Sequence, residues 1–233
     1  MKTKALLISC LLAAMVGTEA NAAIVELTGN DITGTNPNAS NPYKSGIYTN
    51  ANITADGIGR GAGITGLNAN DSYTASGWSK TFLDSVNGND YYTFGIDANP
   101  GYQIDYSTFS YNAIYSGGGP SSLQLEYSTD GGATFKTVGS GQSIEKIAST
   151  SDSIINLSGV TELQNVQGKI IFRLYGYNAN NQNSGSKLYL NNYQFDGSVD
   201  AVPEPQSLAL IGVGSLLMFG YMRRSRHEVD AIA

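Results

Sequence analysis

The sequence predicts an all-β sandwich for the body of the chain, residues 23–201. Within that body no stretch keeps a helical period over ten residues. Short runs of alternating apolar and polar residues recur instead, separated by Gly, Asn, Asp and Ser, as is typical of strands joined by turns. The tripeptide Asp130-Gly131-Gly132 favours a hairpin turn, because Asp-Gly accepts the positive φ angles that a tight turn needs.

The alternating runs predict eight strands, and the stretch 23–77 is the part with the weakest periodicity. That stretch is rich in Gly, Asn and Thr, so after one short strand we expect irregular cover over the sandwich. It includes the glycine-rich segment 57–63, which we interpret as a flexible loop because it lacks a P-loop lysine and a strand-to-helix setting. The expected strands are 24–27, 91–96, 109–115, 123–127, 134–138, 154–157, 169–176 and 187–195.

The last predicted strand changes its register halfway along. Its apolar residues are Leu188 and Leu190, then Tyr193 and Phe195, so the two-residue period slips by one. An extra residue in a strand bends it and resets which side chains face inward. We therefore expect a β-bulge near 191–192.

Composition excludes several kinds of site in the body. It has eight basic and fifteen acidic residues, a formal charge of −7, which disfavours nucleic acid and anionic headgroups as partners. It has no histidine, so a Ser-His-Asp triad and a His-zinc site are excluded. The chain's one cysteine, Cys10, precedes the body, so disulfides within the body are excluded as well.

The first 22 residues predict an N-terminal signal helix for export. Lys2 and Lys4 precede an apolar segment at 5–16, and 20–22 is an A-x-A cleavage site. The Sec translocon and signal peptidase are the partners this implies, with Ala20, Ala22 and Ala23 around the cut. The alternative is a lipoprotein box acylated at Cys10, but only five residues separate it from Lys4.

A second apolar run predicts a single transmembrane helix at 207–222. The run carries no charge, and in a bilayer only a helix would satisfy its backbone hydrogen bonds. Its 16 residues would rise about 24 Å, so bilayer thinning and arginine snorkelling must supply the rest. Positive charge marks the cytoplasmic side, which places the body outside and 227–233 as a cytoplasmic tail. The positive charge is that of Arg223, Arg224 and Arg226, which follow the apolar run. The alternative interpretation of 207–222 is a buried core helix.

The tail as a whole resembles a known sorting signal. Pro203, Glu204 and Pro205, the apolar run and the arginine cluster are similar to the PEP-CTERM signal of exported bacterial proteins, over 202–226. The resemblance implies a Gram-negative source, recognition by exosortase and cleavage near the Pro-Glu-Pro. It also implies an inner-membrane intermediate, followed by delivery to the cell surface or beyond.

Parts of the body resemble a second group of proteins. The segments 115–132 and 172–192 look like the jelly-roll domains of PEP-CTERM proteins, which are similar to galactose-binding-like modules. The resemblance implies a jelly-roll sandwich but no particular ligand, since one sandwich fold serves many functions.

Aromatic residues are the candidates for binding a glycan. Aromatic rings stack on the C–H faces of sugars, while Asn and Asp bind the hydroxyl groups. The alternative is a structural role, in which the rings face the core, as the β-propensity of aromatic residues favours. The candidates are Trp78 and a platform formed either by Tyr175 and Tyr177 or by Tyr106 and Tyr115.

Oxygen ligands for calcium are a further hypothesis, with no other cofactor expected. Asp130 and Asp196, or Asp152, would supply carboxylates to such a site, although Asp130 is also explained as a turn residue.

We expect an exported, non-catalytic single-domain protein associated with exopolysaccharide or another glycan. A structural, self-associating matrix protein and a carboxylate-dependent glycosidase are the alternatives, the latter needing only two suitably spaced acids.

Overall fold

A computed structural model describes residues 23–146 and 152–202 of the chain. The predicted signal helix at 1–22, the transmembrane helix at 207–222 and the tail at 227–233 lie outside the described residues. So do the processing residues of the sorting signal from Pro203 onward. Within the described ranges, no helix is both long and apolar enough to cross a bilayer.

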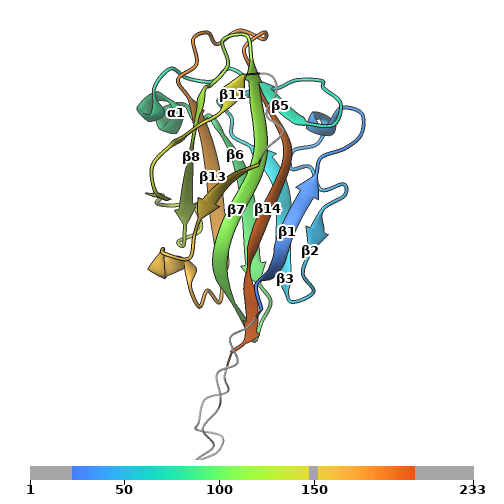
Figure 1. The fold of residues 1–233 in the computed structure, drawn as a ribbon, viewed down its shortest axis with the longest axis vertical. Coiled ribbons are helices and arrows are strands. Elements are labelled where there is room, and N and C mark those ends of the chain that lie inside the picture. The colour runs from blue at the N-terminus through green and yellow to red at the C-terminus, as the bar shows by residue number, and fades with distance from the viewer. Residues whose placement is uncertain (1–22, 147–151, 203–233) are drawn as a thin grey trace, which may run out of the picture.

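The described residues form the all-β sandwich that the sequence predicts, with two layers (Figure 1). The larger sheet has the order β11-β7-β14-β1-β2, with β12 added on β7, and with β5 on β14 and β4 on β5. The smaller sheet has the order β10-β8-β13-β6-β3, with β9 on β8. The strands of the larger sheet are β1 (Val25–Asp31), β2 (Tyr48–Thr49), β4 (Thr65–Gly66), β5 (Tyr73–Ser76), β7 (Tyr102–Ser116), β11 (Glu145–Lys146), β12 (Ser153–Asn156) and β14 (Lys187–Ala201). Those of the smaller sheet are β3 (Ile53–Arg60), β6 (Tyr91–Ala98), β8 (Ser122–Ser128), β9 (Lys136–Thr137), β10 (Gln142–Ser143) and β13 (Lys169–Tyr177); the helices are η1 (Pro37–Ala39), α1 (Phe82–Gly88) and η2 (Thr161–Leu163).

Strand β14 lies between β7 and β1 and pairs with both in antiparallel register. The register against β7 shifts between Leu190 and Asn192, which confirms the predicted bulge. The bulge keeps Leu188 and Leu190 buried before it and Tyr193 and Phe195 buried after it. Without the extra residue, the second pair would face solvent.

The core between the sheets is largely aromatic. The Phe195 ring stacks on that of Phe109 in the neighbouring strand, with the ring centroids 4.4 Å apart. The Phe195 ring also contacts the rings of Phe172 and Phe94 in the smaller sheet, with centroid distances of 4.7 Å and 5.6 Å. These contacts cross between the layers, so they hold the two sheets in one relative position.

The stretch 23–77 is more regular than the sequence predicts. It contributes β3, a full edge strand of the smaller sheet, and β5, which pairs with β14. The expectation of irregular cover is therefore wrong, and part of the glycine-rich segment at 57–63 lies in β3 rather than in a loop. β3 escapes the periodicity test because its glycines supply no apolar side chains and its register shifts between Ala55 and Ile58.

Helix α1 is also absent from the sequence prediction, because its seven residues are too few to show a helical period. Its N-terminus is capped by Thr81, whose Oγ1 accepts from the Asp84 amide at 3.1 Å and donates to the Asp84 carboxylate at 2.7 Å. A Thr followed three residues later by an acid is a capping signal that the sequence does contain.

We expect replacement of Tyr92 by Phe to lower the free energy of unfolding by about 1 kcal/mol. The fully buried Tyr92 hydroxyl, from the smaller sheet, lies within hydrogen-bond distance of the carbonyls of Tyr73 (3.0 Å) and Leu188 (3.1 Å) in the larger sheet. Urea unfolding measures the change, with Y48F at a half-exposed tyrosine as the matched control. Equal stability of Y92F and the unmodified chain would contradict this role.

Candidate functional site

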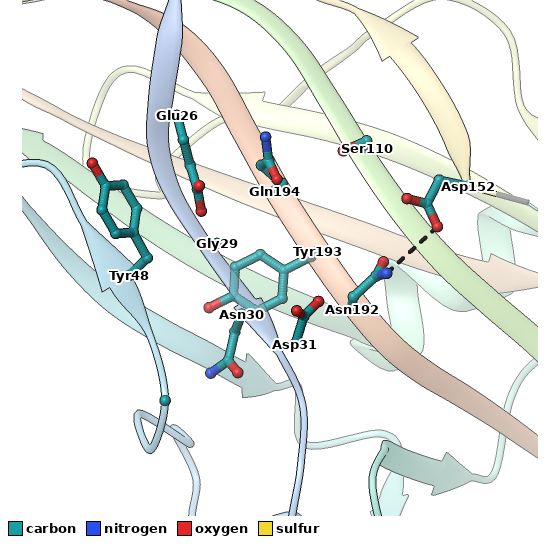
Figure 2. A pocket seen from close by; sticks show the side chains of 11 residues that line it. Glu26, Gly29, Asn30, Asp31, Tyr48, Ser110, Asp152, Asn192, Tyr193 and Gln194 are labelled. Atoms are coloured by element: carbon teal, nitrogen blue, oxygen red, sulfur yellow. Dashed lines mark hydrogen bonds between the residues drawn. The ribbon is translucent and has the colours of Figure 1, made fainter.

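A groove of about 360 Å³ lies on the outer face of the larger sheet. Its lining comes from β1, β2, β7 and β14 and from Asp152 just before β12 (Figure 2). The site therefore gathers strands that are far apart in the sequence. The lining includes Glu26, Asp31, Tyr48, Ser110, Asn192 and Gln194.

The pairing register arranges the outward side chains in rows across the sheet. In the central row, Gln194 pairs with Gly29 on one side and with Ser110 on the other. In the next row, Asn192 pairs with Asp31 and with Asn112. Because paired residues of neighbouring strands share a face, every member of these rows points away from the core.

Gly29 lies in the central row between Tyr48 and Gln194, and the Glu26 carboxylate lies over it in the place of a side chain. A Cβ there would lie 2.7 Å from Glu26 Oε1 and 2.9 Å from the Tyr193 carbonyl oxygen, too close for any larger residue. The row ends on two exposed side chains, Tyr48 paired with Gly29 and Ile154 paired with Ser110. Tyr48 is 48% exposed and Ile154 is 62% exposed. A polar floor therefore runs between an exposed aromatic ring and an exposed aliphatic side chain.

Negative charge concentrates in and beside the groove. Burial, together with the charges of Asp196 and Asp31, raises the pKa of the Glu26 carboxyl. Asp152 Oδ1 accepts from the Asn112 and Asn192 side-chain amides at 3.4 Å and 3.5 Å. Among the described residues that line the groove, none is Lys, Arg or His. Asp152 therefore has amide partners, and none of the carboxylates of the lining has a cationic side chain beside it in the lining.

Three of the predicted aromatic residues lie in the core rather than at a binding surface. Trp78, Tyr106 and Tyr175 are at most 1% exposed. The Trp78 indole donates to the Ala75 carbonyl at 2.9 Å and packs edge-on against Tyr92. These rings offer no free face for a sugar, so for them the core interpretation is correct and the stacking prediction is not.

Tyr115 and Tyr177 are half-buried and lie on different sheets. Tyr177 contacts the ring of Phe82 from α1, with the centroids 5.6 Å apart. Neither residue lines the groove. Each of the two predicted pairs, Tyr175 with Tyr177 and Tyr106 with Tyr115, therefore contains one ring that is buried in the core.

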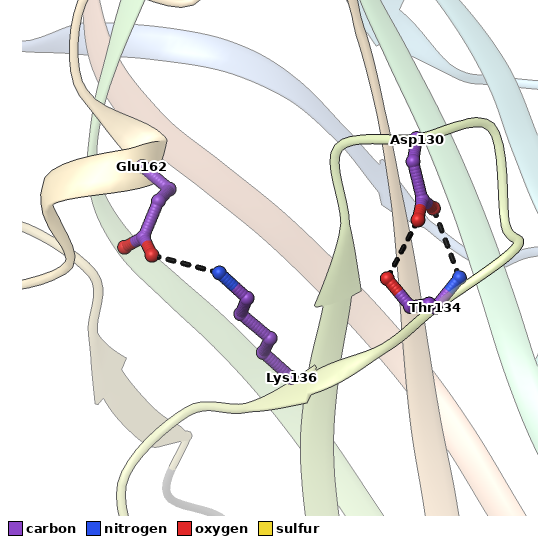
Figure 3. Close-up of polar contacts among 4 residues, drawn as sticks. All are labelled: Asp130, Thr134, Lys136 and Glu162. Atoms are coloured by element: carbon purple, nitrogen blue, oxygen red, sulfur yellow. Dashed lines mark hydrogen bonds and ion pairs between the residues drawn. The ribbon is translucent and has the colours of Figure 1, made fainter.

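The two aspartates predicted as calcium ligands have protein partners. Asp130 accepts from the Thr134 amide at 3.0 Å and the Thr134 hydroxyl at 2.6 Å, which closes the predicted turn (Figure 3). Hydroxyl donors hold the pKa of Asp130 well below its usual range. Asp196 accepts from Thr108 at 3.0 Å and Gln194 at 2.7 Å. Across 23–146 and 152–202, no three acids, His or Cys gather as a metal site.

Beside that turn, Figure 3 also shows an exposed ion pair, Lys136 to Glu162 at 2.9 Å. It joins the short strand β9 to η2, the helical turn ahead of β13. Both side chains are about half exposed, so the pair contributes little to stability.

We expect E26Q to raise the melting temperature at neutral pH. Because folding raises the Glu26 pKa, the native state binds its proton more tightly than the unfolded chain, and stability falls as pH rises through that raised pKa. Glutamine removes the free-energy cost of ionising Glu26 in the folded state. The gain in melting temperature is therefore full above the pKa of the folded state and vanishes below the pKa of the unfolded state, near 4.5. Calorimetry at several pH values measures the change, with D200N on the neighbouring strand β14 as control. A gain independent of pH would contradict this explanation.

Comparison with known proteins identifies the end of the chain. The PEP-CTERM protein-sorting motif matches residues 201–226, which confirms the sorting signal predicted at 202–226. No curated protein matches the chain in sequence.

Solved structures similar to the chain include CBM29_1, a family 29 carbohydrate-binding module from Piromyces equi. It has 10% identity and a TM-score of 0.39, over 77% of this chain and 92% of that one. An F5/8 type C domain from Bacteroides fragilis has 9% identity and a TM-score of 0.32, over 55% and 74%. A family two carbohydrate esterase from Cellvibrio japonicus has 8% and 0.30, over 78% and 36%. TM-scores this low carry no argument about ligand or chemistry. The chain therefore carries a PEP-CTERM sorting motif behind a two-sheet β-sandwich.

Proposed function

We propose that the chain is an exported, non-catalytic protein whose body binds a glycan strand in the groove of the larger sheet. The observation that carries the proposal is the central row, in which a polar floor leads to the exposed ring of Tyr48. A sugar has an apolar C–H face and a rim of hydroxyl groups. The row offers an aromatic face for the first and Gln194 and Ser110 for the second.

The shape of the groove supports an extended ligand. The floor crosses four strands, and at Gly29 it carries no side chain of its own, so the Glu26 carboxylate lies there within reach of a ligand's hydroxyl groups. A single pyranose would occupy only part of this length, whereas a chain of sugars would contact the row from Tyr48 to Ile154. Such a ligand accords with exopolysaccharide as the partner.

The sorting motif supports an exported location for this body. In the proposed route, Sec and signal peptidase release residues 1–22, and the helix at 207–222 holds the body outside the inner membrane. Exosortase then cuts near Pro203-Glu204-Pro205, and the sandwich passes to the cell surface or the medium. The domain boundaries, the processing residues and these partners all belong to the proposal.

A glycosidase is the second candidate, because the same groove holds carboxyl groups in different environments. Burial and two neighbouring acids raise the pKa of Glu26, as would suit a general acid. Turnover of a bound glycan, abolished by E26Q, would favour this candidate. A self-associating matrix protein is the third, and concentration-dependent assembly without glycan binding would favour it.

We expect Y48A to weaken glycan binding roughly 2- to 10-fold, because an aromatic stacking contact is worth about 0.5–1.5 kcal/mol. Affinity electrophoresis of the full chain through gels containing polysaccharides measures the change. Intrinsic tryptophan fluorescence is a poor probe, since the chain's one tryptophan, Trp78, is buried in the core.

The matched control for Y48A is Y189A. Tyr189 is a half-buried tyrosine on β14, outside the lining of the groove. Equal losses in both variants, or no loss in Y48A while the unmodified chain binds, would remove the groove as the binding site.

We expect deletion of residues 203–226 to release the protein from the membrane fraction. The deletion removes the uncharged apolar run and the arginines that end it, so no segment predicted to enter a bilayer remains after the signal peptide is cut. Fractionation with an antibody against the body measures this. An unchanged distribution would contradict the sorting route but not the glycan site.

A further inference from the structure

We infer that the terminal segment of the sandwich, residues 200–202, detaches from β7 so that the processing protease can bind the sorting motif. The inference rests on the sorting route of the proposed function and adds a conformational step to it. It starts from an overlap between motif and fold. The motif begins at Ala201, yet β14 continues to Ala201 and the Val202 amide still donates to the Gly101 carbonyl at 2.9 Å. The first two residues of the motif therefore belong to the folded sheet.

The free chain on the other side of the overlap is short. Only residues 203–206 separate Val202 from the apolar run at 207–222. An extended chain spans at most about 3.6 Å per residue, so with the run in a bilayer Val202 lies within about 18 Å of its first residue. Cleavage requires backbone that is neither buried nor hydrogen-bonded. A protease that holds residues on both sides of the cut therefore gains usable chain if the terminal segment opens.

The end of β14 has a partner strand on one side only. Among the described strands, β1 pairs with β14 as far as Gly197, whereas β7 pairs with it as far as Ala201. Figure 1 shows this end of β14 projecting beyond the start of β1 at the lower end of the sandwich. A strand end with a single neighbour has fewer contacts to lose, so local opening starts there more easily than in the centre of the sheet.

The facing segment of β7 is held more firmly, so β14 is the strand that moves. Ile104 of β7 exchanges two backbone hydrogen bonds with Val166, at 2.8 Å and 2.9 Å, and its side chain is fully buried. Opposite Ile104, Val199 of β14 packs against the core. Opening from the free end therefore costs little at 200–202 and more from Val199 inward.

Proline prevents the ladder from continuing past the terminal segment. Pro203 and Pro205 have no backbone N–H, so neither can donate to a sheet. The hydrogen bond from Val202 is therefore not reinforced by its neighbour in the motif. When opening and closing are fast relative to cutting, the rate of cutting follows the fraction of molecules that are open. The pairing at 200–202 then sets the rate of processing.

A disulfide can hold the terminal segment closed. Ala201 lies opposite Tyr102, and the next pair, Val202 with Gly101, is joined by a hydrogen bond. Because hydrogen-bonded and non-hydrogen-bonded pairs alternate, the Ala201 pair is of the second kind, with Cα atoms about 4.5 Å apart. A disulfide bridges that distance, and it forms in the oxidising space outside the inner membrane.

The test follows the cutting of the pulse-labelled full chain in a Gram-negative host that has exosortase. We expect the oxidised double variant Y102C/A201C to be cut at least about tenfold more slowly than the unmodified chain, and dithiothreitol to restore the rate. Y102C and A201C alone are the matched controls and should be cut at the unmodified rate. Inserting about eight Gly and Ser residues between Val202 and Pro203 should accelerate cutting, even with the disulfide closed.

Hydrogen exchange of the full chain measures the opening without the protease. We expect the Val202 amide to exchange at least about tenfold faster than that of Ile104. Equally slow exchange of the two amides, or cutting of oxidised Y102C/A201C at the unmodified rate, would overturn the inference while the sorting route stands. No cutting of either the unmodified chain or the linker variant would overturn both, and the glycan-binding proposal would stand.

Discussion

The alternation of side chains along β14 is the constraint on which the rest of the structure depends. This strand runs between β7 and β1 and also pairs with β5. Its register therefore determines which side chains of most of the larger sheet point to the core and which point to solvent. Inward, Phe195 enters the aromatic core that joins the layers. Outward, Asn192 and Gln194 form the floor of the groove. The bulge after Leu190 lets one strand serve both surfaces, because it resets the period where the apolar pattern slips.

Both sheets carry a groove on the outer face, of about 360 Å³ on the larger sheet and about 350 Å³ on the smaller, and the two grooves differ in their lining. On the smaller sheet, the Arg173 guanidinium lies between the rings of Tyr91 and Phe135, at 4.2 Å and 3.8 Å from their centroids. Nearby, Lys169 and Asp56 form an ion pair at 2.5 Å, and a Cβ on Gly95 would collide with it. On the larger sheet, Gly29 leaves room for the Glu26 carboxylate and Tyr48 stays half exposed. The described residues that line the groove of the smaller sheet include no aromatic ring, so the exposed ring of Tyr48 favours the larger sheet as the ligand-binding face.

Local patterns in the sequence predicted those parts of the fold that local chemistry determines. The bulge follows from four apolar residues whose spacing changes, and the turn at Asp130 follows from the conformational freedom of Asp-Gly. The edge strand β3 was missed because Gly57 and Gly59 give no alternation to detect. Trp78 is buried whereas Tyr48 is half exposed, and this difference in burial is a property of the folded chain that residue type does not reveal.

The candidate site was out of reach of the sequence for a related reason. Its members come together through pairings between residues more than 150 positions apart, such as Asp31 with Asn192. Tyr48 and Gly29 lie in the weakly periodic stretch, where no strand beyond the first was expected. Asp152 and Asp196, considered as metal ligands, instead accept hydrogen bonds from amide groups at or beside the groove. Only the register of the sheet turns these scattered polar residues into one surface.

The most direct measurement is a nuclear magnetic resonance titration of the isotope-labelled chain with the glycan that it binds. If the groove is the site, the amide signals of Gly29, Ser110 and Gln194 shift together and saturate at one affinity. Signals on the outer face of the smaller sheet, such as those of Tyr91 and Arg173, stay in place. Shifts confined to the smaller sheet, with the β14 signals unchanged, would contradict the account.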